Sequence, residues 1–286
     1  MKIGAMVESF RLGFRGGVEK AAELGAEGIQ AYATYGELAP ENMTPAKIRE
    51  TLDIVKSNGL VFSALCGDFG HGFMNPEENK IYVEKSKRVL DLAKQLECNV
   101  VTTHIGTVPA EENATKEIMR AACRELAEYA DSVDAAFAVE TGPEPGKILG
   151  EFLDSLGAGG VRVNFDPANL VMVSDDRPEN ALKYLGKYVV HTHAKDGIML
   201  KKKIEEAIEI GEEAKEHQAL LGMGQTYLEL PLGEGDVNFD TYLPALAATG
   251  FNGFLTIERE GGSQPEKDIA LAVNFLKEKI EKFNLK

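Results

Sequence analysis

The chain has 286 residues, of which 31 are basic and 46 acidic, so its formal net charge is −15 and its pI is near 4.9. This acidic balance disfavours nucleic acid and anionic membranes as partners. A hydrophobic fraction of 44% and a charged fraction of 27% exclude wholesale disorder. Cys66, Cys98 and Cys123 form no CxxC pair, and no run of 18 apolar residues occurs, so we expect a cytoplasmic protein.

Eight short apolar runs alternate with helical segments along the chain. The runs cover residues 2–7, 28–33, 60–66, 99–104, 136–140, 161–166, 188–193 and 254–258. The amphipathic segments between them are clearest at 44–58, 76–97, 113–131 and 265–282. Continuous β-branched runs are typical of parallel strands buried on both faces. We predict an α/β fold in which residues 1–286 form a single (β/α)₈ TIM barrel. An open sheet is the alternative, but no GxGxxG motif follows the first run to support a dinucleotide-binding fold.

One segment interrupts this alternation. Between the seventh predicted strand and Asn238 lies an insert, residues 197–237, with the charged helical run KKKIEEAIEIGEEAKEH. In a barrel, an insert between strand 7 and helix 7 lies at the catalytic end. We therefore predict a helical insert that acts either as a lid or as a solvated surface helix.

Metal-competent side chains end the last four predicted strands. They are Glu140, Asp166, His193 and Glu258. These strands are neighbours in a barrel, and their alternation allows the four side chains to converge at its mouth. Three carboxylates and one imidazole suit Mn²⁺, Mg²⁺, Co²⁺ or Zn²⁺, and a cation would offset the repulsion between the carboxylates. The sequence thus predicts one divalent metal ion held by these four residues.

Several motifs carry a family resemblance. The chain is similar to the sugar phosphate isomerase/epimerase family, whose fold is that of xylose isomerase and which includes ketose 3-epimerases, inosose-processing enzymes and, more distantly, endonuclease IV. The resemblance lies in VETGPEP (139–145), NFDPANL (164–170), HTHAKD (191–196), PLGEGDVNF (231–239) and FLTIERE (254–260).

The resemblance implies a TIM barrel with one metal ion, most often Mn²⁺, on Glu140, Asp166, His193 and Glu258. In the ketose epimerase branch the two glutamates are also the acid/base pair. Carried over, Glu140 and Glu258 would remove and return a proton on the carbon next to a carbonyl. The resemblance also allows a homodimer or homotetramer.

The chain departs from two branches of this family. The ketose 3-epimerase branch has a substrate-binding His three residues after the Asp and an Arg six residues after the metal His, where this chain has Asn169 and Met199. Those two contacts therefore do not carry over. The endonuclease branch needs further histidines, and the DxH pattern expected after strand 7 is missing.

Other polar residues near the predicted strand ends are candidates for binding substrate. Gln30 and Tyr32 are predicted on the rim of the barrel mouth that lies opposite the metal ligands. His191 is predicted one layer below His193. The substrate-binding candidates are Glu8, Cys66, Asp68, His104, Asn169, Lys195 and Glu229.

We predict a metal-dependent isomerase or epimerase of a sugar or sugar-derived ketone, phosphorylated or not, acting by α-proton abstraction through a metal-stabilised enediolate. Its partner is a small carbohydrate. The nearest alternative is an inosose-dehydratase-like lyase that uses the same proton abstraction. An endonuclease IV-like phosphodiesterase and a non-catalytic metal-binding or sugar-sensing barrel are further alternatives.

Overall fold

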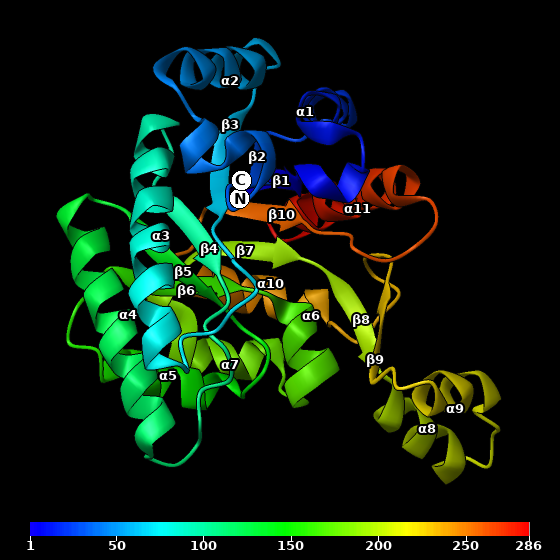
Figure 1. Cartoon of the computed structure of the whole chain (residues 1–286). Helices are drawn as coiled ribbons and strands as arrows, with labels where there is room; N and C mark the ends of the chain where they lie inside the picture. The colour runs from blue at the N-terminus through cyan, green and yellow to red at the C-terminus, as the bar shows by residue number, and fades with distance from the viewer. Residues whose placement is uncertain (286) are drawn as a thin grey trace.

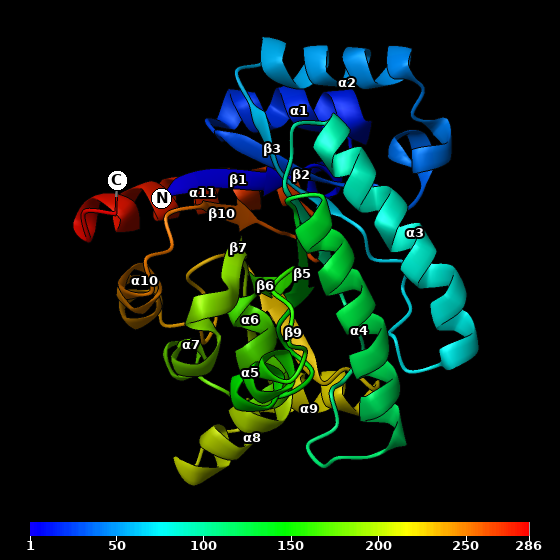
Figure 2. The same cartoon turned by 90° about the vertical axis from the view of Figure 1, so that its left-hand side faces the viewer.

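Eight parallel strands form a closed barrel in the computed structural model, which describes residues 1–285 (Figures 1 and 2). Their order around the barrel is β1-β10-β7-β6-β5-β4-β3-β2. The predicted (β/α)₈ TIM barrel is therefore confirmed. The strands are β1 (Lys2–Met6), β2 (Gly28–Tyr32), β3 (Val61–Cys66), β4 (Val100–Thr103), β5 (Ala136–Glu140), β6 (Val161–Phe165), β7 (Val189–Ala194) and β10 (Phe254–Ile257).

Helices follow the barrel strands and surround them (Figure 2). Several begin with a capping side chain followed by proline: Thr44 accepts a hydrogen bond from the Lys47 amide, and Asn75 accepts one from the Glu77 amide. The barrel helices are α1 (Gly13–Leu24), α2 (Pro45–Ser57), α3 (Pro76–Gln95), α4 (Ala114–Ser132), α5 (Gly146–Asp154), α6 (Pro167–Asn169), α7 (Pro178–Leu185), α10 (Phe239–Ala248) and α11 (Pro265–Lys282).

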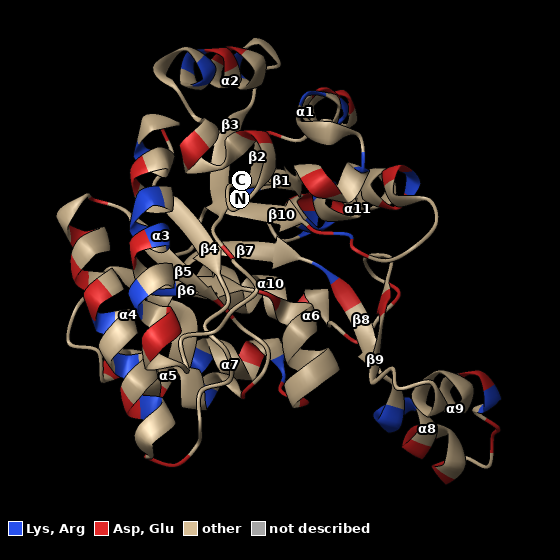
Figure 3. Cartoon of the chain, in the orientation of Figure 1, with Lys and Arg blue, Asp and Glu red and all other residues tan. Residues whose placement is uncertain are grey.

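The hydrophobic core lies between the barrel and these helices. Strand residues such as Val101, Phe137 and Phe165 are completely buried. Acidic and basic residues lie interspersed along the outer helices α3 and α4 (Figure 3). No helix among residues 1–285 combines the length and the apolar character needed to cross a bilayer.

The insert after β7 is a hairpin that carries two helices and projects from the barrel (Figure 1). Its strands β8 (Asp196–Met199) and β9 (Tyr227–Leu230) pair antiparallel, with Asp196 opposite Leu230 and Met199 opposite Tyr227. Helices α8 (Leu200–Glu209) and α9 (Lys215–Gly222) lie at its far end. The predicted helical insert is confirmed. Its two strands were not predicted, because each is short and pairs with a segment about thirty residues away.

Candidate metal centre

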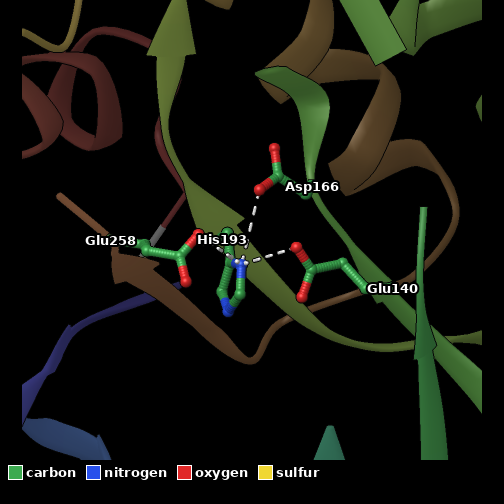
Figure 4. A group of neighbouring side chains, drawn as sticks. All are labelled: Glu140, Asp166, His193 and Glu258. Atoms are coloured by element: carbon green, nitrogen blue, oxygen red, sulfur yellow. Dashed lines mark ion pairs between the residues drawn. The ribbon is translucent and has the colours of Figure 1, made fainter. Parts of the chain in front are cut away.

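The four predicted metal ligands converge at the carboxyl ends of four consecutive barrel strands (Figure 4). One candidate ligand atom from each lies within 4.8 Å of the others. Nδ1 of His193 is 3.6 Å from Oε1 of Glu140, 3.4 Å from Oδ2 of Asp166 and 3.3 Å from Oε2 of Glu258. All four side chains are buried. The centre is therefore a closed cluster of one imidazole and three carboxylates.

Asp166 shows how local sequence shapes this cluster. It is the N-cap of α6, and its Oδ1 accepts hydrogen bonds from the amides of Ala168 and Asn169 at 2.8 and 3.0 Å. The cap occupies one carboxylate oxygen and aims the other at His193. Oδ2 of Asp166 and Nδ1 of His193 are both buried and have no hydrogen-bond partner among residues 1–285. Buried polar atoms without partners are uncommon, and two that face each other across a carboxylate cluster fit a cation-binding site.

The imidazole of His193 and the carboxylates around it stabilise each other's charged forms. Burial alone would lower the pKa of His193, but the carboxylates of Glu258 and Glu140 raise it well above its ordinary value. Burial alone would raise the pKa of Glu140 and Glu258, because it disfavours the charged form of these groups too. Positive charge on His104 and His193 instead lowers the pKa of Glu140 well below its ordinary value, and His193 and Lys195 lower that of Glu258 to about 2. The site therefore stabilises a positive charge at its centre.

A polar layer beneath the cluster fixes its geometry. Nδ1 of His191 lies 2.8 Å from Oδ1 of Asn164, and the amide nitrogen of Asn164 donates to Oε2 of Glu140 at 3.2 Å. Nε2 of His191 lies 2.9 Å from Oγ1 of Thr256. Gly4 of β1 leaves room for this layer, since a Cβ there would lie 2.6 Å from the Thr256 hydroxyl. His191 thus lies below His193, as predicted, and braces the cluster by holding Asn164 against Glu140.

A cavity of about 220 Å³ opens above the cluster. Glu140, His193 and Glu258 form part of its wall. Five of the seven predicted substrate-binding residues also line it: Cys66, Asp68, His104, Asn169 and Lys195.

Four of these residues make direct contacts with the cluster or with each other, namely Asp68, His104, Asn169 and Lys195. Nδ1 of His104 is 3.0 Å from Oδ2 of Asp68, and its Nε2 is 3.5 Å from Oε1 of Glu140. The carboxylate of Glu140 is the main cause that raises the pKa of His104 to about 11. The amide of Asn169 donates to Oε1 of Glu140 at 2.9 Å.

Lys195 connects the two glutamates that follow β10. Its Nζ donates to Oε2 of Glu258 at 2.8 Å and to Oε2 of Glu260 at 2.6 Å. Burial alone would lower the pKa of Lys195, but the carboxylates of Glu258, Asp166 and Glu260 raise it well above its ordinary value. Asp196 does not pair with Lys195. It accepts hydrogen bonds from backbone amides, among them those of Gly233, Gly235 and Val237, and thereby holds the loop after β9.

The structure places Glu8 and Glu229 away from this cavity. Oε1 of Glu8 accepts a hydrogen bond from the Tyr32 amide, and Glu8 lines a neighbouring cavity of about 380 Å³. The carboxylate of Glu229 is bonded to Arg259 and to the amides of Glu260 and Gly261.

Gln30 does reach the cavity wall, but its side chain is completely buried instead of lying on an open rim. Its Oε1 lies 3.1 Å from Nε2 of His193. The sequence pattern at the strand ends could not predict how deeply the Gln30 side chain is buried, because that depends on how far each strand extends along the barrel.

Three further residues of the wall were not predicted. Met6 and Thr103 end β1 and β4, and Tyr227 comes from the hairpin. Met6 and Thr103 were detectable as strand-end residues, although neither carries a charged or metal-ligating group. Tyr227 gave no local signal, because the hairpin pairing alone brings it to the barrel mouth.

The fold and site together define a TIM-barrel protein with a candidate divalent-metal centre in its mouth. The family model for the xylose isomerase-like TIM barrel matches residues 18–279, and the chain belongs to this family. A comparison with curated proteins gave no match.

Solved structures of this fold are similar over nearly the whole chain. A xylose isomerase domain protein from Planctomyces limnophilus is 25% identical with a TM-score of 0.80, and the match covers 99% of this chain and 98% of that one. A D-tagatose 3-epimerase-like protein is 21% identical with a TM-score of 0.73, over 99% and 98%. A xylose isomerase-like TIM barrel protein from Mycobacterium smegmatis, solved in complex with magnesium, is 15% identical with a TM-score of 0.73, over 99% and 97%. The last two likenesses show the fold alone.

Proposed function

We propose that the chain is a divalent-metal-dependent isomerase or epimerase of a sugar or a sugar-derived ketone. The observation that carries this proposal is the cluster of Glu140, Asp166, His193 and Glu258, in which two buried ligand atoms have no partner among residues 1–285. The magnesium in the Mycobacterium smegmatis structure and the epimerase-like neighbour support it.

The donor set fits a metal ion of intermediate hardness. Three carboxylates and one imidazole accept Mn²⁺, Mg²⁺, Co²⁺ or Zn²⁺, and we propose Mn²⁺ from the family resemblance. When bound, the ion polarises a substrate carbonyl and stabilises negative charge on its oxygen.

Glu140 and Glu258 are the proposed acid/base pair. Both carboxylates line the cavity, and each is oriented by neighbours: Glu140 by Asn164 and Asn169, and Glu258 by Lys195. One glutamate takes the proton from the carbon next to the carbonyl, the C–H electron pair becomes the carbon–carbon double bond of an enediolate, and the π electrons of the carbonyl move onto its oxygen. The other glutamate returns a proton. Return to the opposite face of the same carbon inverts it. Return to the neighbouring carbon, with a proton passing from the hydroxyl of the first carbon to the oxygen of the second, exchanges ketose and aldose.

Lys195 and His104 line the same cavity and bear positive charge beside the two glutamates. We propose that they donate hydrogen bonds to substrate hydroxyl groups. Asp68, which orients His104, limits how far the imidazole can turn. These residues thus orient the carbon chain between the two carboxylates.

Solvent exchange tests the proposal across many substrates. Ketoses, inososes and their phosphates are incubated in D₂O with the protein and MnCl₂, and deuterium next to the carbonyl is followed by NMR. We expect exchange with at least one substrate, accompanied by an epimer or an aldose. Loss of water with a new ultraviolet absorbance would identify a lyase instead. Absence of exchange with every ketone, combined with metal-dependent cleavage of DNA, would overturn the proposal.

A further inference from the structure

Nε2 of His193 lies between two amide side chains with opposite hydrogen-bonding character. Oε1 of Gln30 is 3.1 Å from Nε2, and Nδ2 of Asn164 is 3.2 Å from the same atom. The first is an acceptor and the second a donor. All three side chains are buried with at most 1% exposure, so bulk water does not replace either contact.

A metal ion at the carboxylate cluster requires the lone pair of Nδ1. A neutral imidazole that offers Nδ1 carries its proton on Nε2, and that N–H needs an acceptor. Asn164 does not supply one. Its Oδ1 is already taken by Nδ1 of His191 at 2.8 Å, which turns its NH₂ group toward Glu140 and His193. Gln30 Oε1 is the acceptor that remains.

The orientation of Gln30 is itself fixed. Its Nε2 donates to Oγ1 of Thr102 at 3.0 Å, and the Thr102 hydroxyl donates to the carbonyl of Leu65 at 3.4 Å. Because the hydroxyl proton is directed at Leu65, Oγ1 presents a lone pair to Gln30. This arrangement holds the amide oxygen of Gln30, and not its nitrogen, against His193.

We propose that Gln30 is a positioning residue that selects the tautomer of His193 in which Nδ1 is free to bind metal. This rests on the proposed function, because it takes His193 to be a metal ligand. Loss of a hydrogen bond to the ring nitrogen that does not bind the metal typically weakens the metal affinity of such a histidine site by about 10- to 100-fold. Gln30 acts through His193 alone and has no direct part in the reaction.

The test compares Gln30→Met with Ser63→Ala by isothermal titration of metal-free protein with MgCl₂ and MnCl₂. Methionine keeps the length of glutamine and lacks its amide oxygen. Ser63 is another buried polar residue, but its hydroxyl contacts Ile29 and His191 instead of His193. In Ser63→Ala the Nε2 of His191 keeps its closer contact with Thr256 at 2.9 Å. We expect an affinity about 10- to 100-fold weaker for Gln30→Met and an unchanged affinity for Ser63→Ala. Wild-type affinity in a folded Gln30→Met variant would overturn the proposal.

A second measurement needs no variant. In wild-type protein with ¹⁵N-labelled histidine and bound Mg²⁺, we expect the Nε2 resonance of His193 to be that of a protonated nitrogen. A bare Nε2 would overturn the inference while leaving the metal site intact. Wild-type protein that binds neither ion would overturn the proposed function and this inference together, so the two failures are distinguishable.

Discussion

Glu229 and Arg259 form a buried ion pair that fastens the hairpin to the barrel. Oε1 of Glu229 lies 2.6 Å from Nη1 of Arg259, and both side chains are 8% exposed. Arg259 also donates from Nε to Asp268 of α11 at 3.0 Å. The base of the hairpin is therefore anchored to the loop that carries Glu260. We expect it to be a fixed wall of the cavity, so that lid motion is confined to the projecting helices α8 and α9.

Removing Glu229 should destabilise the protein. Glu229→Ala leaves Arg259 buried with one carboxylate partner, and we expect a loss of about 3 kcal/mol in the free energy of unfolding, measured with urea. Glu213→Ala is the control within the insert, because Glu213 pairs with Lys215 at 2.6 Å with both side chains more than 70% exposed. That change should cost less than about 1 kcal/mol. Equal effects of the two variants would show that the buried pair does not anchor the hairpin.

Glu258→Gln should strongly slow proton exchange. The amide keeps an oxygen but is not a base, and we expect the rate of α-proton exchange on an identified substrate to fall by about 10²–10⁴-fold. Metal content is measured on the same sample, so that loss of the ion is distinguished from loss of the base. Glu234→Gln, an exposed change in the nearby loop, should retain full activity. Turnover by a metal-loaded Glu258→Gln variant would contradict the acid/base assignment.

Burial raises the pKa of Glu144 to about 7 from 4.5, although its carboxylate accepts a hydrogen bond from the Val108 amide. The folded state thus binds this proton more tightly than the unfolded state. The contribution of the Glu144 carboxyl to the free energy of unfolding should therefore fall by about 2–3 kcal/mol as pH rises from about 4.5 to 7. Glu144→Gln should remove this part of the pH dependence. Urea unfolding of both proteins at pH 5 and 8 measures it, and an identical decrease in the two would contradict the assignment.

Metal affinity should rise with pH. The pKa of His193 is raised well above its ordinary value. In metal-free protein the imidazolium therefore stabilises the folded state, and this stabilisation is lost only as pH rises through the raised pKa. A metal ion must displace the Nδ1 proton. We expect the apparent affinity to increase about tenfold per pH unit while one proton is displaced. Titrations at several pH values in buffers of different ionisation enthalpy measure the proton release, and zero release would refute it.

The barrel and the candidate site were largely predictable because their signals are local. Strands buried on both faces, such as β5 and β6, require continuous apolar runs, and the polar residue that ends each one stands out in the sequence. Gly25, with φ of +87° after α1, marks a helix end in the same way. Four metal-competent side chains on consecutive strands then needed only the barrel topology to be brought together.

Long-range pairing was not predictable in this way. The β8–β9 hairpin, the ion pair of Glu229 with Arg259 and the contact of Gln30 with His193 each join residues that lie 28 or more positions apart in the sequence. Their residue types are common in surface loops and on strand rims. Only the register of the strands and the tilt of the barrel decide that these groups meet.

Diffraction from crystals soaked in MnCl₂ tests most directly whether a metal ion occupies the cluster. We predict one anomalous peak per chain, in contact with Nδ1 of His193 and with carboxylate oxygens of Glu140, Asp166 and Glu258, and no peak in crystals of Asp166→Ala. An empty cluster in the soaked wild-type crystals, or manganese bound only elsewhere, would contradict the account.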